Sequence, residues 1–150
     1  MSTQATDLTI HKTVIVAAPV EQAFETFTER LGEWWPTDTH SIGHDRVEAV
    51  IREGAVGGRL FERHFDGEEA SWGRVLAWEP PTRLVLEWRV NEEWPAPTEI
   101  EVRFSAEGDG TRVELEHRGW ERLGASAAES SANYNKGWDV VLAPFVARLS

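Results

Sequence analysis

From residue 47 onward the chain is a succession of short strand-like runs, and turn signals separate these runs about every 8–14 residues. The signals are a glycine pair at residues 57–58, Asp-Gly pairs at 66–67 and 109–110, a proline pair at 80–81, and two prolines at 95–97. The clearest hairpin joins residues 99–105 to residues 111–117, because Gly108 and Gly110 supply the backbone freedom that a tight turn requires. Apolar and charged side chains alternate in both runs. The pattern predicts an antiparallel meander with one buried face.

A strand and a helix are predicted ahead of the meander. Residues 8–16 alternate loosely and are rich in β-branched side chains, which is typical of a strand. Pro19 then stands where the first turn of a helix favours proline, and an apolar stripe follows at Val20, Ala23, Phe24, Phe27 and Leu31. The helix is predicted to end near Gly32, and residues 37–45 have the composition of turns.

A long helix is predicted to end the chain. Ser126 and Glu129 have the spacing of a capping box, in which a hydroxyl and a carboxylate three residues later bind the first backbone N–H groups. An apolar stripe then runs to the C-terminus, at Tyr134, Trp138, Val141, Leu142, Phe145 and Leu149. Gly137 and Pro144 interrupt it, and glycine alone costs up to about 1 kcal/mol against alanine in a helix. We therefore expect a bent helix that arches over a space.

The composition favours one soluble domain. A chain of 150 residues suits a single domain over residues 1–150, in which residues 1–7 are expected to form a flexible tail. With no cysteine, the chain has neither disulfides nor zinc–thiolate sites. No signal peptide or apolar run of ~20 residues is present, so a cytoplasmic protein without membrane insertion is expected. The net charge of −11 disfavours nucleic acid and anionic membranes as partners.

Five groups of residues lie in an order that is typical of one protein family. They are Glu33-Trp34-Trp35-Pro36 with Thr39-His40-Ser41-Ile42, Gly57-Gly58-Arg59, Trp72-Gly73-Arg74-Val75, Trp78-Glu79-Pro80-Pro81 with Arg83-Leu84-Val85, and His117-Arg118-Gly119-Trp120, and Gly137-Trp138 agrees with them. With these motifs and this order of elements, residues 8–149 resemble the START-like helix-grip superfamily. Within it they resemble the branch of homologues of the activator of the heat-shock-protein-90 ATPase.

The resemblance implies an α+β helix-grip fold. A curved antiparallel sheet of six to seven strands would wrap around the C-terminal helix, with one or two short helices after the first strand. A hydrophobic cavity would lie between sheet and helix, with its entrance near the segment after the first helix. The family consists mostly of ligand-binding or functionally unassigned proteins and takes its name from a eukaryotic co-chaperone. This chain has no room for that co-chaperone's other domain, so activation of a chaperone ATPase is not expected.

The aromatic residues are the predicted cavity walls, although each of them also suits a plain core. The chain has eight tryptophans, whose large apolar rings each carry one N–H that needs a partner. Trp88 is predicted to point inward with Leu84 and Leu86, because charged residues occupy the opposite parity of that strand. The directions of Trp72 and Trp78 stay open, since both parities of their strand are apolar. The predicted ligand-binding residues are Trp34, Trp35, Trp88, His117, Trp120, Tyr134, Trp138 and Phe145.

Three polar residues are weak candidates for chemistry. His117 continues the buried parity of its strand, so it either anchors a ligand oxygen or is a core histidine bonded to a carbonyl or to Tyr134. Glu62 and His64 share one face of a strand. An inward pair would favour acid–base chemistry, whereas an outward pair would be an ordinary exposed ion pair, and the outward reading is favoured.

A metal site at the histidines after the first helix is not expected. His40 and His44 have the spacing that places two imidazoles on one helical face, and Asp45 follows them. The intervening Ser-Ile-Gly is a poor helix former, so the spacing loses its meaning and a surface loop is predicted. No motif for phosphate or dinucleotide binding is present, and no cofactor is predicted.

The sequence therefore favours a protein that binds a small apolar or amphipathic ligand, as a monomer or homodimer. Its cavity is expected to hold at least about 300 Å³, the lower bound for typical ligand sites. One alternative is a cyclase, dehydratase or hydrolase that uses His117 or the pair of Glu62 and His64. A second alternative is a co-chaperone-like module that binds a protein through exposed tryptophans.

Overall fold

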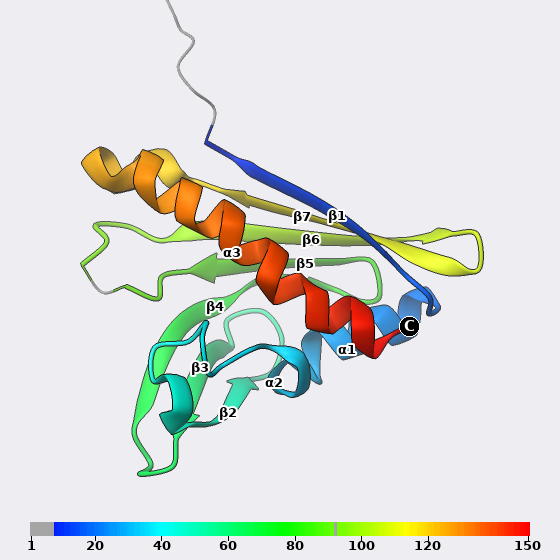
Figure 1. Cartoon of the computed structure of the whole chain (residues 1–150), viewed down its shortest axis with the longest axis horizontal. Coiled ribbons are helices and arrows are strands. Elements are labelled where there is room, and N and C mark those ends of the chain that lie inside the picture. Colours follow the sequence, from blue (N-terminus) through cyan, green and yellow to red (C-terminus); the bar gives the residue numbers. More distant parts are fainter. Residues whose placement is uncertain (1–7, 92) are drawn as a thin grey trace, which may run out of the picture.

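In the computed structural model, which describes residues 8–91 and 93–150, a seven-stranded antiparallel sheet curves around one long helix (Figure 1). The strand order is β1-β7-β6-β5-β4-β3-β2, so neighbours in the meander are neighbours in the sheet. The predicted α+β helix-grip class is confirmed. The elements are β1 (Ile10–Val16), α1 (Val20–Thr28), α2 (Leu31–Trp34), η1 (His44–Arg46), β2 (Val47–Arg52), β3 (Arg59–His64), β4 (Glu69–Glu79), β5 (Arg83–Trp88), β6 (Thr98–Glu107), β7 (Gly110–Arg118), η2 (Trp120–Ser126) and α3 (Ala127–Arg148).

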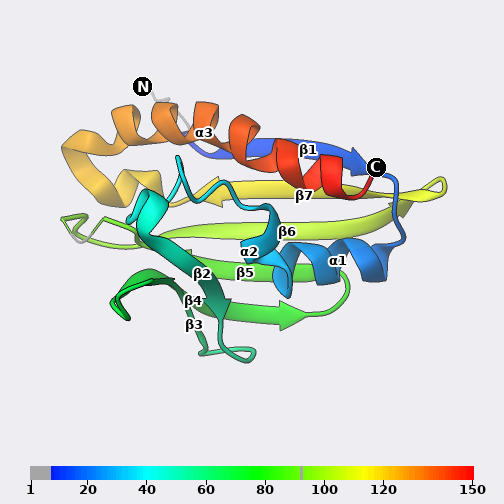
Figure 2. The ribbon, with the colours of Figure 1, turned by 60° about the horizontal axis from the view of Figure 1, so that its bottom comes forward.

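The helices lie together on the concave side of the sheet. Figure 2 shows α1 and α2 beside the C-terminal half of α3. Phe27 of α1 and Trp34 of α2 both pack on Phe145 of α3, with ring centroids 5.2 and 5.1 Å apart. The apolar stripe that was predicted for one helix is divided between two helices, because α1 ends at Thr28 and α2 begins at Leu31. The predicted tail, residues 1–7, lies outside the described residues.

The predicted hairpin and long helix are both present, but the predicted helix cap is wrong. Glu107 pairs with Gly110 across a two-residue turn, where Gly108 has a φ of 59°. The long helix α3 follows Ser126 directly and continues through Gly137 and Pro144. The hydroxyl of Ser126 donates to the carbonyl of Leu123 at 3.4 Å and makes no bond to the helix. The 3-10 segment η2 leads directly into α3. The Ser126 hydroxyl bonds to Leu123 within η2, so it is not available to cap the helix.

Strand β4 contains two bulges, which settle the open orientations of Trp72 and Trp78. The register shifts once against β3, near Gly73, and once against β5, between Val75 and Ala77. As a result Trp72, Val75 and Trp78 all face the concave side, although a regular strand would alternate them. A Cβ at Gly73 would lie 1.7 Å from the carbonyl oxygen of Glu87, and its φ is 151°. Only glycine allows β4 and β5 to approach so closely.

The inward tryptophans fill most of the core between the sheet and the helices. Trp72 is only 1% exposed, and Trp88, as predicted, is buried with Leu84 and Leu86. Trp78 is half-buried and packs its ring on Phe24 of α1, with centroids 5.1 Å apart. Because these rings point inward, the interior is largely solid, and the space for a ligand is confined to one end of the groove between sheet and helix.

Candidate functional site

A pocket of about 270 Å³ lies between α3, the strands β4 and β5, and the segment 35–42. It is slightly smaller than expected and is located where the helix-grip resemblance implied a cavity. Of residues 37–45, which were predicted to form turns, residues 37–43 contain neither helix nor strand, whereas His44 and Asp45 begin the 3-10 helix η1. The lining residues are Trp35, His40, Ser41, Ile42, Trp72, Trp88, Val90, Asn133, Tyr134, Gly137, Trp138 and Val141.

Four tryptophans from four different segments form one aromatic cluster at this pocket. The ring of Trp35 lies 5.0 Å from Trp72, 5.9 Å from Trp88 and 5.8 Å from Trp138, measured between centroids. Trp72 and Trp88 are 5.4 Å apart, and their planes are inclined by 62°. Tilted and edge-to-face pairs of this kind are the favourable aromatic geometries.

Each of the four indole N–H groups already donates a hydrogen bond within the protein. The acceptors of Trp35 and Trp72 are the His40 carbonyl at 2.6 Å and a carboxylate oxygen of Glu62 at 2.7 Å. The N–H of Trp88 donates to the Tyr134 hydroxyl, and that of Trp138 donates to Nδ1 of His117, both at 3.1 Å. The rings are thereby fixed in orientation and offer the pocket their apolar carbon surfaces.

Glu62 is a fully buried carboxylate behind this pocket, so the expectation of an exposed pair with His64 is wrong. The side chain of Glu62 is 0% exposed and accepts four hydrogen bonds. The donors are the backbone N–H groups of Ile42 (2.8 Å) and Gly43 (2.6 Å), Nε2 of His64 (2.6 Å) and Nε1 of Trp72 (2.7 Å). One carboxylate therefore connects β3, β4 and the pocket-lining segment 40–43.

The charge of Glu62 is stabilised by these donors. Burial alone would raise the pKa of its carboxyl, but the hydrogen bonds from His64, Ile42, Trp72 and Gly43 outweigh burial and hold the pKa below its ordinary value. A Cβ at Gly43 would lie 2.4 Å from Nε2 of His64, so glycine is required where the segment meets the pair. The alternation of the strand correctly predicted that Glu62 and His64 share one face. It could not indicate that the segment 40–43 covers that face.

His117 is a core histidine with both ring nitrogens occupied. It is 0% exposed, Nδ1 accepts from Trp138, and Nε2 lies 2.8 Å from Oγ1 of Thr98. Since the hydroxyl of Thr98 donates to the carbonyl of Trp88, Nε2–H of His117 is the donor to Thr98. Burial lowers the pKa of His117 to about 3, so the ring stays neutral at ordinary pH. Its partners are Thr98 and Trp138 in place of the predicted carbonyl or Tyr134.

The pocket brings together half of the predicted ligand-binding residues. Trp35, Trp88, Tyr134 and Trp138 line it. The other four, namely Trp34, His117, Trp120 and Phe145, are buried behind these residues or elsewhere in the core. Trp120, for example, packs under Tyr134 with ring centroids 5.1 Å apart and donates its N–H to the His117 carbonyl. Whether any of the eight contacts a ligand stays a prediction.

Several lining residues were not predicted to bind. Trp72 was left open because the bulges of β4 cannot be read from periodicity. His40 and Ile42 lie on an irregular segment, which has no period to indicate a direction. Asn133 and Gly137 could have been found, since they occupy the same face of α3 as Tyr134, Trp138 and Val141.

The histidines considered for a metal have other partners. Nδ1 of His40 lies 2.7 Å from Oγ1 of Thr39, and Nδ1 of His44 lies 3.1 Å from the carbonyl of Asp38. Within residues 8–91 and 93–150, no group of three or more His, Cys, Asp or Glu side chains could hold a metal ion. Nor does that part of the chain contain a helix long and apolar enough to cross a membrane.

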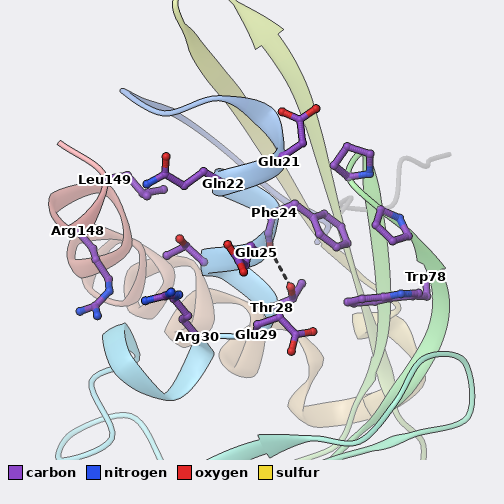
Figure 3. A pocket seen from close by; sticks show the side chains of 13 residues that line it. Glu21, Gln22, Phe24, Glu25, Thr28, Glu29, Arg30, Trp78, Arg148 and Leu149 are labelled. Atoms are coloured by element: carbon purple, nitrogen blue, oxygen red, sulfur yellow. Dashed lines mark hydrogen bonds between the residues drawn. The ribbon is translucent and has the colours of Figure 1, made fainter.

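A second hollow lies on the outer side of α1, but it has the character of an open surface groove. It measures about 1010 Å³ and runs between α1, Trp78, the Pro80-Pro81 corner and the end of α3. Figure 3 shows Glu21 and Glu25 of α1, and Glu29 directly after it, on this surface, with Trp78 across from them. These three glutamates are exposed. The smaller aromatic pocket offers a ligand more apolar enclosure and is therefore the better candidate site.

Fold and pocket together define a protein of the START-like helix-grip class. The chain belongs to the family of Activator of Hsp90 ATPase homolog 1-like proteins, which matches over residues 17–150. Comparison with curated protein sequences gave no match.

Three solved structures illustrate the range of similar proteins. CalC from Micromonospora echinospora, a self-sacrificing resistance protein, is 33% identical, with a TM-score of 0.72 over 95% of this chain and 94% of CalC. The anthrahydroquino-gamma-pyrone synthase Txn09 is 36% identical, with a TM-score of 0.61 over 93% of this chain and 95% of Txn09. The Aha1 dimer from Colwellia psychrerythraea shares the fold at 19% identity, with a TM-score of 0.69 over 94% of this chain and 95% of that one.

Proposed function

We propose that this protein binds a small planar aromatic molecule in the pocket between α3 and the strands β4 and β5. The observation that carries the proposal is the cluster of Trp35, Trp72, Trp88 and Trp138, whose N–H groups are all bonded within the protein. A wall of this kind has little left to offer except apolar ring surface, which suits a ligand that stacks. A volume of about 270 Å³ favours a molecule of about two or three fused rings.

One of the two similar proteins that are about one-third identical supports an aromatic ligand in particular. Txn09 is named as a synthase of an anthrahydroquinone-fused pyrone, which is a planar aromatic compound, and CalC as a resistance protein. Both are about one-third identical to this chain over nearly its whole length. An aromatic ligand is therefore favoured over a flexible aliphatic one. The cytoplasmic location inferred from the sequence agrees with this proposal.

The enzyme alternative gains one observation, because Glu62 and His64 form the buried, inward pair that it required. However, Glu62 accepts four hydrogen bonds from the protein, and both ring nitrogens of His117 are bonded within the core, so both residues are engaged by neighbouring protein groups. In the protein-binding alternative, tryptophans would need to be exposed. Seven of the eight tryptophans are buried and Trp78 is half-buried. Binding of a small molecule, by a monomer or a homodimer, is therefore the function we propose.

Fluorene, a rigid three-ring hydrocarbon, is a suitable probe for calorimetric titration. We expect saturable binding to the wild-type protein. The variant Gly137→Leu should weaken this binding by at least about tenfold, because its side chain would enter the pocket from α3. A Cβ at Gly137 would meet only the His40 ring, at 3.8 Å, and replacing a helical glycine favours folding, so the variant should remain folded.

Asn135→Leu is the matched control, because Asn135 is an exposed residue of the same helix and does not line the pocket. It should bind fluorene as the wild type does. Equal binding by Gly137→Leu and Asn135→Leu, or no binding by the wild-type protein, would contradict the proposed function.

A further inference from the structure

The hydroxyl of Tyr134 is a polar group at the pocket with one unused hydrogen-bonding function. Tyr134 is on the face of α3 that lines the pocket, and its hydroxyl oxygen accepts the N–H of Trp88 at 3.1 Å. Among the hydrogen bonds of residues 8–91 and 93–150, none is donated by this hydroxyl. A phenol that accepts one bond still has its own proton to donate.

The ring of Tyr134 is held in place by its neighbours. It packs edge-to-face on His117, with centroids 5.2 Å apart, and lies 5.1 Å from Trp120 and 6.0 Å from Trp94. These three residues are themselves buried. The hydroxyl position is therefore fixed by the packing of the core, as a preorganised binding group requires.

Tyr134 remains a hydrogen-bond donor across the physiological pH range. Burial is the larger influence and raises the pKa of its hydroxyl, while the bond from Trp88 lowers it, and the result is about 12. The phenol is thus protonated at neutral pH. A ligand atom that meets it must be an acceptor.

The other polar lining groups are less suited to this role. The hydroxyl of Ser41 donates to the Thr37 carbonyl and accepts the N–H of His44. Asn133 is exposed, so water competes for it, and Nδ1 of His40 already lies 2.7 Å from the hydroxyl of Thr39. Tyr134, which is half-buried, combines a fixed position and a free hydroxyl proton in one lining residue.

We infer that Tyr134 anchors a carbonyl oxygen of the ligand, so that the ligand class is planar aromatic ketones or quinones. The inference rests on the proposed function and adds the chemical group that orients the ligand. It moves the role of polar anchor from His117, where the sequence placed it, to the residue that packs against His117.

Fluorene and fluorenone test this inference because they differ only by replacement of a methylene group with a carbonyl. The wild-type protein should bind fluorenone about three- to tenfold more tightly than fluorene, as expected for one added hydrogen bond. In Tyr134→Phe the preference should disappear, while the affinity for fluorene stays the same. Calorimetric titration of both ligands into both proteins gives the four affinities.

The infrared carbonyl stretch of bound fluorenone provides a second measurement. In the wild-type complex it should lie at lower frequency than in an apolar solvent, and the lowering should vanish in Tyr134→Phe. The inference is overturned, with the proposed function intact, if the wild type binds both ligands equally, if the variant weakens both equally, or if the variant retains the lowered frequency. If neither ligand binds the wild type, the proposed function fails and the inference fails with it.

Discussion

At the scale of single residues, Glu62 is the side chain on which most of the pocket's geometry depends. It fixes Trp72 in the pocket wall and ties the segment 40–43 to the sheet through two backbone N–H groups. Glutamine at this position keeps one acceptor oxygen. Its NH₂ group, however, would face N–H groups that now donate to the second carboxylate oxygen. We therefore expect Glu62→Gln to lower the free energy of unfolding by about 2–4 kcal/mol, measured by urea denaturation.

Glu48→Gln is the control for this prediction. Glu48 pairs with Arg63 at 3.1 Å, but both side chains are nearly half exposed. Loss of such a surface pair should cost less than about 1 kcal/mol. If Glu62→Gln proves as stable as Glu48→Gln, the four buried hydrogen bonds of Glu62 do not stabilise the fold.

At the scale of elements, strand β4 is the part whose irregularity shapes the interior. Its bulge at Gly73 lets Trp72 point inward beside Val75 and brings β4 close to β5. Gly73→Ala should therefore lower the free energy of unfolding by more than about 3 kcal/mol, because its Cβ would overlap the carbonyl of Glu87.

Gly54→Ala is the matched control, measured by the same urea denaturation. Gly54 also has a positive φ, 60°, but no atom within 4 Å of an added Cβ, so its loss should be near 1 kcal/mol. Equal losses in the two variants would show that close approach of the strands is not required.

At the scale of the whole molecule, the sequence predicted the fold more fully than the site. Turn signals and alternation were sufficient for the meander, and the stripe from Tyr134 to Leu149 was sufficient for α3, because each of these patterns is local. The inward face of β4 was not predictable, since its two bulges break the period on which a prediction relies. The burial of Glu62 was not predictable either, because two of its four partners, the N–H groups of Ile42 and Gly43, lie about 20 residues away on a segment without regular structure. Tyr134 was predicted to bind the ligand. Its inferred role as a hydrogen-bond donor to the ligand depends on its contact with Trp88, which the sequence could not show.

Intermolecular nuclear Overhauser effects report whether a planar aromatic molecule lies among the tryptophans of the pocket. With fluorene bound, its protons should show contacts to the indole protons of Trp72, Trp88 and Trp138, which line the pocket. Trp78 serves as an internal control, because it lines the open groove beside α1 (Figure 3). Contacts to the pocket tryptophans without contacts to Trp78 are the predicted result. Contacts to Trp78 alone, or to none of the tryptophans, would contradict the account.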